Sequence, residues 1–523
     1  MLQTVLSVRS VESGTPLASS RTETFLQVHR RSIAFGICVY AALRILVFSA
    51  AFPLFNSTDE QFHFDSIIRF ANGYRSMPGL PPVSPELART ATLYGSPQYL
   101  TPEDALRTFH LDQPIAFLHP PLREEKYQHW FTYWSARKNF EIHSPPLYYM
   151  SASLWFRLGS AFGLTSWSLA YWMRFVNAVL YAALVWMGFA FVTEVYPGRS
   201  FLGLAVPALL AVFPQDVFLG MNREVLSAPL AALALLLLMY SLREGRWADF
   251  YLLGGSFCVG LAFLTDISNA VLFFALAAVL CFRLRRAKMI AARSAAFRLL
   301  PRSTLLAAIL PVLWVAHNYI VFRDLTASRE KIAALGWTVK PFSEIWQHPI
   351  FSVHGALYFL EELMKTYWRG EFLWHGRPMT LPAADWFFVL SSYLLIAIFA
   401  AHFIRCLSSQ PVQILSDRLA LALLAASFLF LAVLSLTFDF GRCFYPSRAL
   451  PYFVSGRIIS GTLLPFALIY ASGLEVVLSR FRRWIPPEAS LAALVLVITL
   501  CDFHAKVVVF HSPFNFFSLW AHT

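Results

Sequence analysis

Residues 32–54, SIAFGICVYAALRILVFSAAFPL, decide the fold class of this chain. They form an apolar run of the length, about 20 residues, that an α-helix needs to cross the hydrocarbon core of a membrane. Arg30 and Arg31 come directly before the run, and positive charge next to a span collects on the cytoplasmic side. The run therefore predicts a first, uncleaved membrane-spanning helix, with residues 1–31 as a cytoplasmic tail.

The composition of the whole chain agrees with a membrane protein. Of the 523 residues, 57% are hydrophobic and 14% are charged, whereas soluble domains carry about 25% charged residues. The 49 Phe and 15 Trp residues suit lipid-facing and interfacial positions. The net charge of +12 falls in short loops between apolar runs, so it is typical of cytoplasmic loops and does not indicate nucleic-acid binding.

Further apolar runs follow the first, and most are close to the length of a membrane span. Three basic clusters, at 243–246, 283–302 and 480–483, lie between runs, and we place all three in the cytoplasm. The later runs cover residues 147–164, 172–194, 200–219, 225–242, 249–265, 267–282, 303–322, 386–404, 418–437, 458–478 and 488–508.

The orientation of these loops makes the number of crossings odd. With the N-terminal tail inside, the loop after the first span lies outside, whereas counting back from Arg243 puts residues 195–199 inside. Only one of the two runs between them can then cross. We expect 147–164 to lie at the interface or to re-enter the membrane, because two prolines precede it and it holds an arginine and three serines. A strongly tilted or broken helix elsewhere is the alternative that would also restore the count. This gives about eleven crossings and an external C-terminus.

Two external segments, 55–146 and 323–385, are too long to be simple connections. Both hold aromatic and charged residues, so we expect ordered inserts, with short helices over 85–90 and 102–108 at the membrane surface. The chain is thus predicted to be one all-α membrane domain. Its spans fall at 32–54, within 147–322 and within 386–523.

The cysteines show no spacing that is typical of metal ligands. Several lie within apolar runs, so we interpret them as buried small hydrophobes rather than as a disulfide frame or a zinc site. The six are Cys38, Cys258, Cys281, Cys406, Cys443 and Cys501.

The first candidate site is residues 56–65, NSTDEQFHFD, directly after the first span. Two adjacent carboxylates at a membrane surface, Asp59 and Glu60, are electrostatically costly, and they suggest a base, a metal ligand or a site for a basic substrate. A structural interpretation is that Ser57 or Thr58 caps a helix whose first turn favours both acids. Both interpretations can hold at once.

A second candidate segment is residues 141–149, EIHSPPLYY. The double proline stiffens the start of an apolar helix, and Tyr148 and Tyr149 suit the membrane interface. This structural interpretation does not explain Glu141 and His143, which bind substrate or are merely solvated.

Polar residues also collect at the predicted outer ends of later spans. Charges at membrane depth are costly and often functional, although at span ends they are more often snorkelling anchors. Their shared outward side suits a phosphate-bearing substrate, because arginine binds phosphate oxygens in pairs. No P-loop, GxGxxG, HExxH or GxSxG pattern appears. These residues are Asn222, Arg223, Glu224, Asp266, Arg323, Asp324, Arg369, Glu371, Arg448 and Arg457.

Taken in order, these segments resemble the GT-C superfamily of membrane glycosyltransferases. Within it the chain is similar to bacterial relatives of protein mannosyltransferases and lipid A aminoarabinose transferases, and to a related uncharacterised bacterial family. Thr58-Asp59-Glu60 with His63 is similar to the acidic motif after the first span. Residues 143–149 resemble a His-Pro-Pro-Leu-Tyr-Tyr element, with Ser144 as a departure. Asn222-Arg223-Glu224 resembles an Asn-Asn-Asp element with its last two residues replaced, and shorter matches fall at 317–324, 367–372 and 455–457.

The resemblance implies a GT-C-like bundle and a mechanism. A sugar carried on a polyprenyl phosphate enters from the bilayer, and the acceptor hydroxyl, on a glycan, a lipid or a protein, enters from outside. Asp59 acts as general base, with Glu60 as the adjacent alternative, and the anomeric carbon is inverted. Arg369, Arg448 and Arg457 stabilise the departing phosphate. A divalent metal is left open, and the remaining substrate-binding candidates are His63, Glu141, His143, Asn222 and Glu224.

The main rival function is a transporter or flippase for a lipid-linked or amphipathic solute. Transporters usually show repeat symmetry and broken helices around polar residues at the midplane. In this chain the polar residues gather at one surface and no repeat is apparent. The pattern favours a transferase in a bacterial plasma membrane with its site facing the exterior, and only an activity measurement would exclude a non-catalytic scaffold.

Overall fold

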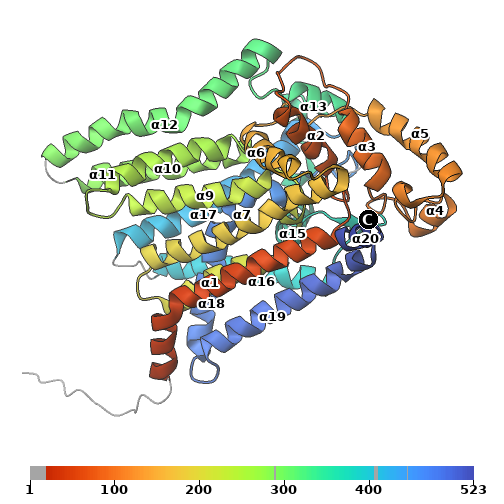
Figure 1. Cartoon of the computed structure of the whole chain (residues 1–523). Helices are drawn as coiled ribbons and strands as arrows, with labels where there is room; N and C mark the ends of the chain where they lie inside the picture. The colour runs from red at the N-terminus through yellow and green to blue at the C-terminus, as the bar shows by residue number, and fades with distance from the viewer. Residues whose placement is uncertain (1–18, 288–289, 406–409, 444–445, 523) are drawn as a thin grey trace, which may run out of the picture.

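The computed structural model describes residues 19–522, apart from 288–289, 406–409 and 444–445, and it describes no side chains at 19–27 and 288–296. Most of the predicted cytoplasmic tail therefore lies outside the described residues, as do Lys288 and Cys406. The described chain is a bundle of long helices that run roughly side by side, with a cluster of short helices at one end (Figure 1).

Among the described residues, eight helical segments are long and apolar enough to cross a membrane, and three shorter apolar helices accompany them. Helices suit this role because every backbone N–H and C=O group is paired within the segment. The all-α polytopic membrane fold is therefore confirmed, and about eleven crossings result if the shorter helices also cross. The long segments are formed by α1 (Ser19–Ala51), α7 (Ser166–Val195), η3 (Ile267–Val271) continued by α11 (Leu272–Arg286), α12 (Ile290–Phe322), α16 (Pro382–Arg405), α17 (Pro411–Thr437), α18 (Leu463–Phe481) and α19 (Pro487–Lys506), and the shorter helices are α8 (Ser200–Val212), α9 (Glu224–Tyr240) and α10 (Ala248–Phe263).

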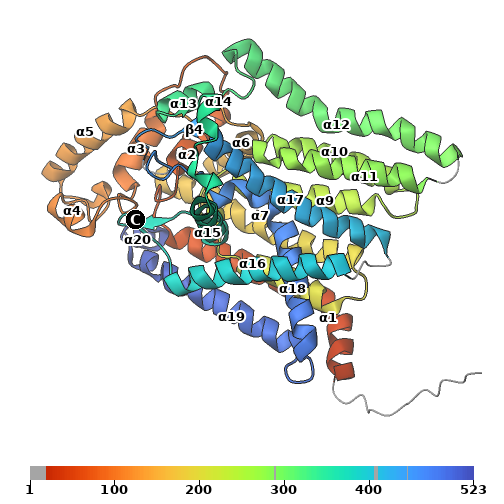
Figure 2. The same ribbon diagram turned by 180° about the vertical axis from the view of Figure 1, so that it is seen from behind.

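The two long inserts lie at the same end of the bundle, called here the loop end (Figures 1 and 2). Short helices occupy both expected stretches of the first insert, since α3 covers 85–90 and α4 covers 103–108 of the expected 102–108. The first insert holds α2 (Glu60–Ala71), α3 (Pro85–Tyr94), α4 (Glu103–Thr108), η1 (Ile115–Phe117) and α5 (Pro120–Ala136), and the second holds α13 (Arg329–Ala334), α14 (Phe342–Ile345), η4 (Pro349–Phe351) and α15 (Val353–Arg369).

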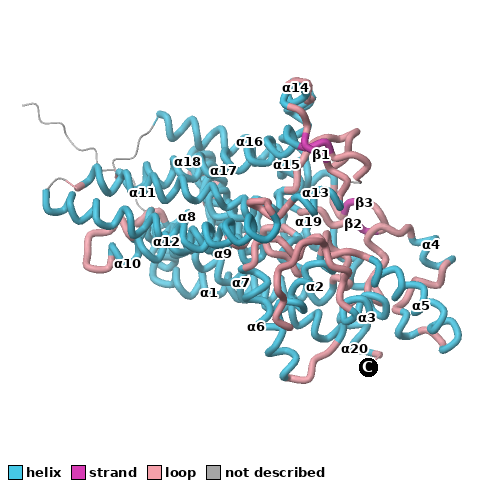
Figure 3. Tube along the Cα trace, turned by 90° about the horizontal axis from the view of Figure 1, so that it is seen from above, coloured by secondary structure: helices cyan, strands magenta, loops and turns pink. Residues whose placement is uncertain are grey.

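Two small antiparallel strand pairs complete the loop end (Figure 3). Strand β1 (Thr338–Val339) pairs with β4 (Phe438–Asp439), which ties the second insert to the end of α17. Strand β2 (Leu373–Trp374) pairs with β3 (Arg377–Pro378) in the chain that follows α15. The remaining short helices are η2 (Asp216–Leu219), η3 (Ile267–Val271), η5 (Gly456–Thr462), η6 (Val507–His511) and α20 (Phe516–Ala521).

Two of the predicted basic loops meet at the opposite end of the bundle. Arg283 pairs with Asp249 at 2.6 Å, and Arg286 pairs with Glu244 at 3.0 Å, so the turn after α9 lies beside the end of α11. Arg243 in that turn pairs with Glu194 near the end of α7. The long inserts and these basic loops are therefore at opposite ends, as expected for loops on opposite sides of a membrane.

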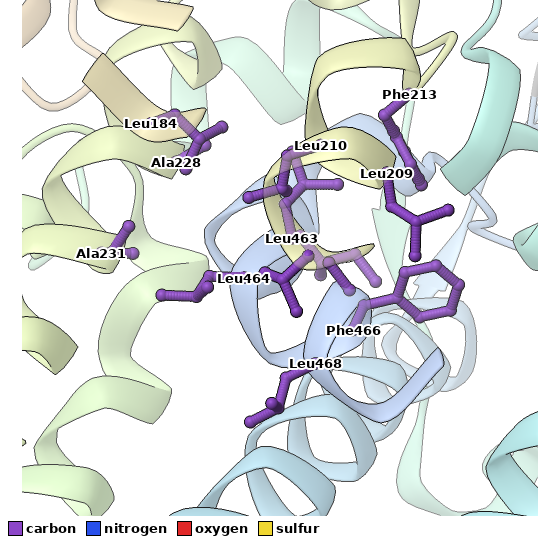
Figure 4. Close-up of a cluster of buried hydrophobic side chains, with 14 of the residues drawn as sticks. Leu184, Leu209, Leu210, Phe213, Ala228, Ala231, Leu463, Leu464, Phe466 and Leu468 are labelled. Atoms are coloured by element: carbon purple, nitrogen blue, oxygen red, sulfur yellow. The ribbon is translucent and has the colours of Figure 1, made fainter. Parts of the chain in front are cut away.

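The core of the bundle surrounds α18, the most enclosed of the candidate spans. Leu464 and Phe466 of α18 are almost fully buried in a cluster that also holds Leu210 of α8, Leu184 of α7 and Ala231 of α9 (Figure 4). Because neighbours cover α18 on all sides, its apolar residues need not follow one stripe. This central helix carries η5 at its loop end, and η5 in turn carries Arg457.

Helix α6 (Leu147–Ala161) is not among the candidate spans. Its first N–H donates to the carbonyl oxygen of Leu264 at 3.1 Å, where α10 ends at the loop end. Shortly after its last residue, the hydroxyl of Ser166 lies 3.4 Å from that of Thr90, which belongs to α3 at the same end. Because both ends of α6 lie at the loop end, these contacts favour our proposal that residues 147–164 do not cross the membrane.

Candidate functional site

A cavity of about 850 Å³ lies at the loop end, between the two inserts and the ends of the spans. One part of its wall is densely charged and the other part is apolar. The charged part is lined by Asp59, Glu141, Arg223, Glu224, Asp266, Lys331, Glu362, Arg369, Glu371 and Arg457, with His63 and His143 beside them. The structure thus brings together most of the residues that sequence reasoning selected.

Asp59 stands at the start of α2, in an unusual backbone conformation. Its φ of 63° is left-handed, which Asp tolerates better than most residues, and its carbonyl accepts the N–H groups of Phe62 and His63. The Asp59 carboxylate forms no capping hydrogen bond. Since the backbone oxygen alone serves the helix, the side chain is left directed to the cavity, where it is 24% exposed.

The capping interpretation of this segment is wrong. The residue at the cap position is Asp59, not Ser57 or Thr58, and no side chain caps α2. The Thr58 hydroxyl instead lies 3.2 Å from that of Tyr99, which belongs to the first insert. The left-handed turn at Asp59 places the start of α2 one to two residues later than a cap at Ser57 or Thr58 predicts. The sequence pattern does not reveal such a turn.

Arg457 is surrounded by three carboxylates. Its Nε donates to Glu371 at 2.9 Å, its Nη1 lies 3.4 Å from Glu224, and its Nη2 lies 3.7 Å from Asp59. The Arg457 side chain is 13% exposed, and that of Glu224 is 1% exposed. Three separate elements, α2, α9 and the turn after α15, therefore meet at η5 through this one guanidinium.

A second charged group adjoins the first. Arg223 pairs with Asp266 at 3.0 Å and reaches Glu141 at 3.5 Å. Glu141 also accepts hydrogen bonds from Lys331 and, at 2.6 Å, from the hydroxyl of Ser144. Arg223 therefore supplies a cation to the acids of two other segments.

The two histidines of the cavity have different surroundings. His63 is buried, and its Nδ1 lies 2.8 Å from the Tyr149 hydroxyl. His143 lies with its Nε2 3.2 Å from the Glu330 carboxylate, against the ring of Phe322. Burial lowers the pKa of His63 to about 3, so its imidazole is neutral at physiological pH.

The carboxylates of the cavity differ in proton affinity. Burial, together with the nearby Glu141 carboxylate, raises the pKa of Asp59 above its ordinary value, despite the opposing charge of Arg457. Burial alone would also raise the pKa of Glu141, but Lys331 and Arg223 hold it below the ordinary value. Asp59 is thus the stronger base of the two, whereas Glu141 is a permanent anion.

Three of the predicted catalytic and substrate-binding residues are not at the cavity. Glu60 is fully buried beside it and pairs with Arg174 at 2.6 Å, and it also accepts the N–H groups of Phe55 and Met221. Asn222 is buried behind the wall. Arg448 is exposed and binds Asp439 at 2.7 Å, outside the lining.

Some of the lining residues were not singled out from the sequence. Lys331, on α13, and Tyr99, after α3, lie in the long inserts with no motif around them. The sequence signal for Lys331 is weak, because solvated lysines are common in polar loops. Burial raises the pKa of Tyr99 to about 12, so this hydroxyl keeps its proton.

The apolar part of the wall comes from α17 and the chain that follows it. Phe430 and Leu434 line it from α17, Phe453 follows, and Trp337 and Leu335 face them from the second insert. This part adjoins the strand pair of β1 and β4. A ligand in the cavity would therefore meet charged groups at one part and hydrocarbon at the other.

A metal ion held by three or more acids, histidines or cysteines has no site in the described part of the chain. Among those residues, no group of three or more His, Cys, Asp or Glu side chains is placed to hold one. The carboxylates nearest Asp59 face Arg457 instead.

The fold and the cavity define a class: a polytopic helical membrane protein with a charged site at one end of its bundle. No protein-family model matches the sequence, and no curated protein matches it. Two similar solved structures are of the oligosaccharyltransferase from Archaeoglobus fulgidus. One, with Zn and sulfate, has 13% identity and a TM-score of 0.36 and covers 90% of this chain and 52% of that chain. The other, with an inhibitory peptide and a dolichol-phosphate, has 13% identity and a TM-score of 0.40 and covers 93% and 56%. The chain spans just over half the length of each.

Proposed function

We propose that this protein is a membrane glycosyltransferase that moves a sugar from a polyprenyl-phosphate donor to an acceptor hydroxyl. The observation that carries the proposal is the cavity at the loop end, where an incompletely paired carboxylate, Asp59, lies among arginines beside an apolar wall. A lipid-linked sugar phosphate has matching parts, since its phosphate suits the charged groups and its hydrocarbon suits the wall.

In the proposed reaction, Asp59 takes the proton of the acceptor hydroxyl. The freed oxygen attacks the anomeric carbon as the bond from that carbon to the phosphate oxygen breaks, so the configuration inverts and polyprenyl phosphate leaves. A raised pKa suits this role, because a base works best when its pKa approaches the working pH.

The cations of the cavity would serve the departing phosphate. Arg369 lines the cavity and is held by both oxygens of Asp385, at 3.0 and 3.1 Å, and Arg457 stands beside Asp59. Preorganised cations of this kind stabilise charge that develops in the transition state. Arg448 has no part in this proposal, because it lies outside the cavity.

The rival proposal, a transporter or flippase, has less support. A transporter binds its solute near the midplane between repeats, whereas this cavity lies at one end of the bundle and is built largely from the inserts. We further propose that the protein lies in a bacterial plasma membrane with the loop end facing the exterior. The basic loops at the other end support this orientation.

The test is the substitution Asp59→Asn in the full chain, expressed in a strain from which the gene is deleted. We expect transfer, read from the surface glycans by mass spectrometry, to fall by about 100- to 10,000-fold, the contribution of a general base. Asp104→Asn, in the exposed helix α4, is the matched control and should leave the glycans unchanged. Full transfer by Asp59→Asn at wild-type abundance in the membrane would remove Asp59 from the mechanism.

A further inference from the structure

The cation at the centre of the charged wall is part of the chain itself. Arg457 meets a different carboxylate on each of its three nitrogen atoms: Glu371 on Nε, Glu224 on Nη1 and Asp59 on Nη2. Carboxylates that share a poorly solvated site repel one another, so such a group needs a cation to stay ionised. The guanidinium of Arg457 supplies such a cation without a ligand from solution.

The position of Arg457 is built by close backbone packing. Gly456, the preceding residue, lies against the backbone of Tyr367 in α15, and a Cβ at this position would overlap it. The N–H of Gly456 also donates to the Thr366 hydroxyl at 3.1 Å. Because η5 is held against α15 here, the guanidinium is held between the carboxylates rather than at the end of a loose loop.

The arrangement suits a flat guanidinium better than a spherical ion. A divalent cation needs several oxygens at about 2.0–2.6 Å from one point. Here the three carboxylates lie along different edges of a planar group, and among the described residues no set of three or more His, Cys, Asp or Glu is placed to hold a metal.

We propose that Arg457 occupies the role that a divalent cation would fill in such a site, so that this protein acts without a divalent metal. A guanidinium has five N–H donors, and three of them face the carboxylates, which leaves two for a phosphate oxygen of the substrate. The guanidinium is charged at every physiological pH, so it always supplies one positive charge between Asp59, Glu224 and Glu371. The statement about activity rests on the proposed transfer, whereas the statement about metal binding does not.

The first experiment measures metal binding alone. The purified full chain in detergent is titrated with Mn²⁺, and free Mn²⁺ is followed by electron paramagnetic resonance, for the wild type and for Asp59→Asn and Glu224→Gln. We expect the three curves to coincide. A wild-type site that weakens by about tenfold or more in either variant, the loss expected when a metal ligand is removed, would overturn the inference.

The second experiment measures transfer. We expect wild-type transfer to persist after exhaustive treatment with a chelator, and transfer lost to the chelator and restored by Mg²⁺ or Mn²⁺ would overturn the inference. Arg457→Ala should lower transfer by about 100-fold, the contribution of one oriented charged donor. Millimolar guanidinium should raise transfer by Arg457→Ala about tenfold, the value of one charged hydrogen bond. Mg²⁺ should not raise it. Recovery with Mg²⁺ in place of guanidinium would contradict a role that is specific to arginine.

Arg448→Ala is the matched control for Arg457→Ala. It removes an exposed arginine that is also paired with a carboxylate, Asp439, so guanidinium should have no effect on it. A chain that shows no Mn²⁺ site at these carboxylates and no transfer at all refutes the proposed function only. A chain that transfers sugar and binds Mn²⁺ through Asp59 refutes this inference only.

Discussion

Two neighbouring residues, Asp59 and Glu60, have opposite environments. The Asp59 carboxylate is directed to the cavity, whereas Glu60 is fully buried and its oxygens accept two backbone N–H groups and Arg174. Asp59 has a left-handed backbone and Glu60 is the first residue of α2, so the two side chains leave the chain in different directions, one to the cavity and the other into the bundle.

The pH dependence of transfer should report Asp59. Because its pKa is raised and a base must be ionised, kcat/KM should fall as the pH is lowered, with a midpoint above the ordinary Asp value of about 3.9. A pH profile of the purified enzyme in detergent measures this. A profile with no acid limb above pH about 4 would contradict the assignment.

The same shift predicts how Asp59→Asn affects stability. A raised pKa means that the folded state holds the proton more tightly than the unfolded state, so the contribution of Asp59 is greatest at low pH and is lost as the pH rises through the folded pKa. At neutral pH, Asp59→Asn should therefore be at least as stable as the wild type. A lower Tm in detergent would contradict this expectation. It would also mean that a loss of transfer could come from unfolding rather than from the missing base.

Glu60→Gln should act on stability rather than on chemistry. It leaves the buried Arg174 without a counter-charge, and breaking a buried pair from one side costs about 3–5 kcal/mol. Thermal unfolding in detergent measures the loss. Glu103→Gln, which breaks the exposed pair with Arg107, is the matched control and should cost no more than about 0.5 kcal/mol. Equal Tm values for the two variants would show that the Glu60 pair is not structural.

At the scale of elements, the turn after α15 determines where Arg369 and Glu371 lie. Gly370 between them has a φ of 85°, and a Cβ there would overlap the Asp216 carboxylate, which accepts the N–H of Phe372 at 2.7 Å. Glycine is needed both for the left-handed backbone and for this close approach.

Gly370→Ala should therefore abolish transfer by moving both site residues. The matched control is Gly163→Ala, which also has a positive φ, 79°, but has open space around its added methyl group. The control should lower the free energy of unfolding by only about 1–2 kcal/mol, the cost of a strained backbone, and should leave transfer intact. If the Tm falls equally in both variants and both keep transfer, the contact with Asp216 has no effect on the site.

At the scale of the whole molecule, the position of α6 determines the topology. Its two ends contact loop-end residues, so the chain should reach the start of α7 without crossing again after α1. A reporter fused at residue 168 should therefore give an external signal, as should one in the first insert. A cytoplasmic signal at residue 168 would contradict this topology and would require another non-crossing segment.

Long-range ion pairs also connect distant parts of the bundle. Arg44 of α1 and Lys506 of α19 both bind Asp502, each at 2.6 Å, and the Lys506 ammonium donates to the Pro214 carbonyl at 2.7 Å. Charges inside a helical bundle need such partners, because water is absent. This group joins the first span, the last long span and the loop before η2.

The sequence by itself determined the properties that depend on neighbouring residues. Hydropathy over about 20 residues is enough to define a span, so the all-α membrane fold and the two inserts were predictable, as were the short helices at 85–90 and 102–108. The choice of Asp59 also came from its local setting after the first span.

Only the tertiary structure decided which charges meet. Glu60 binds Arg174, Arg448 lies outside the cavity, and Arg457 meets Asp59 from the far end of the chain. Each pairing depends on how helices that are distant in the sequence pack together. Hydrophobic periodicity and short motifs describe only neighbouring residues, so they do not predict that packing.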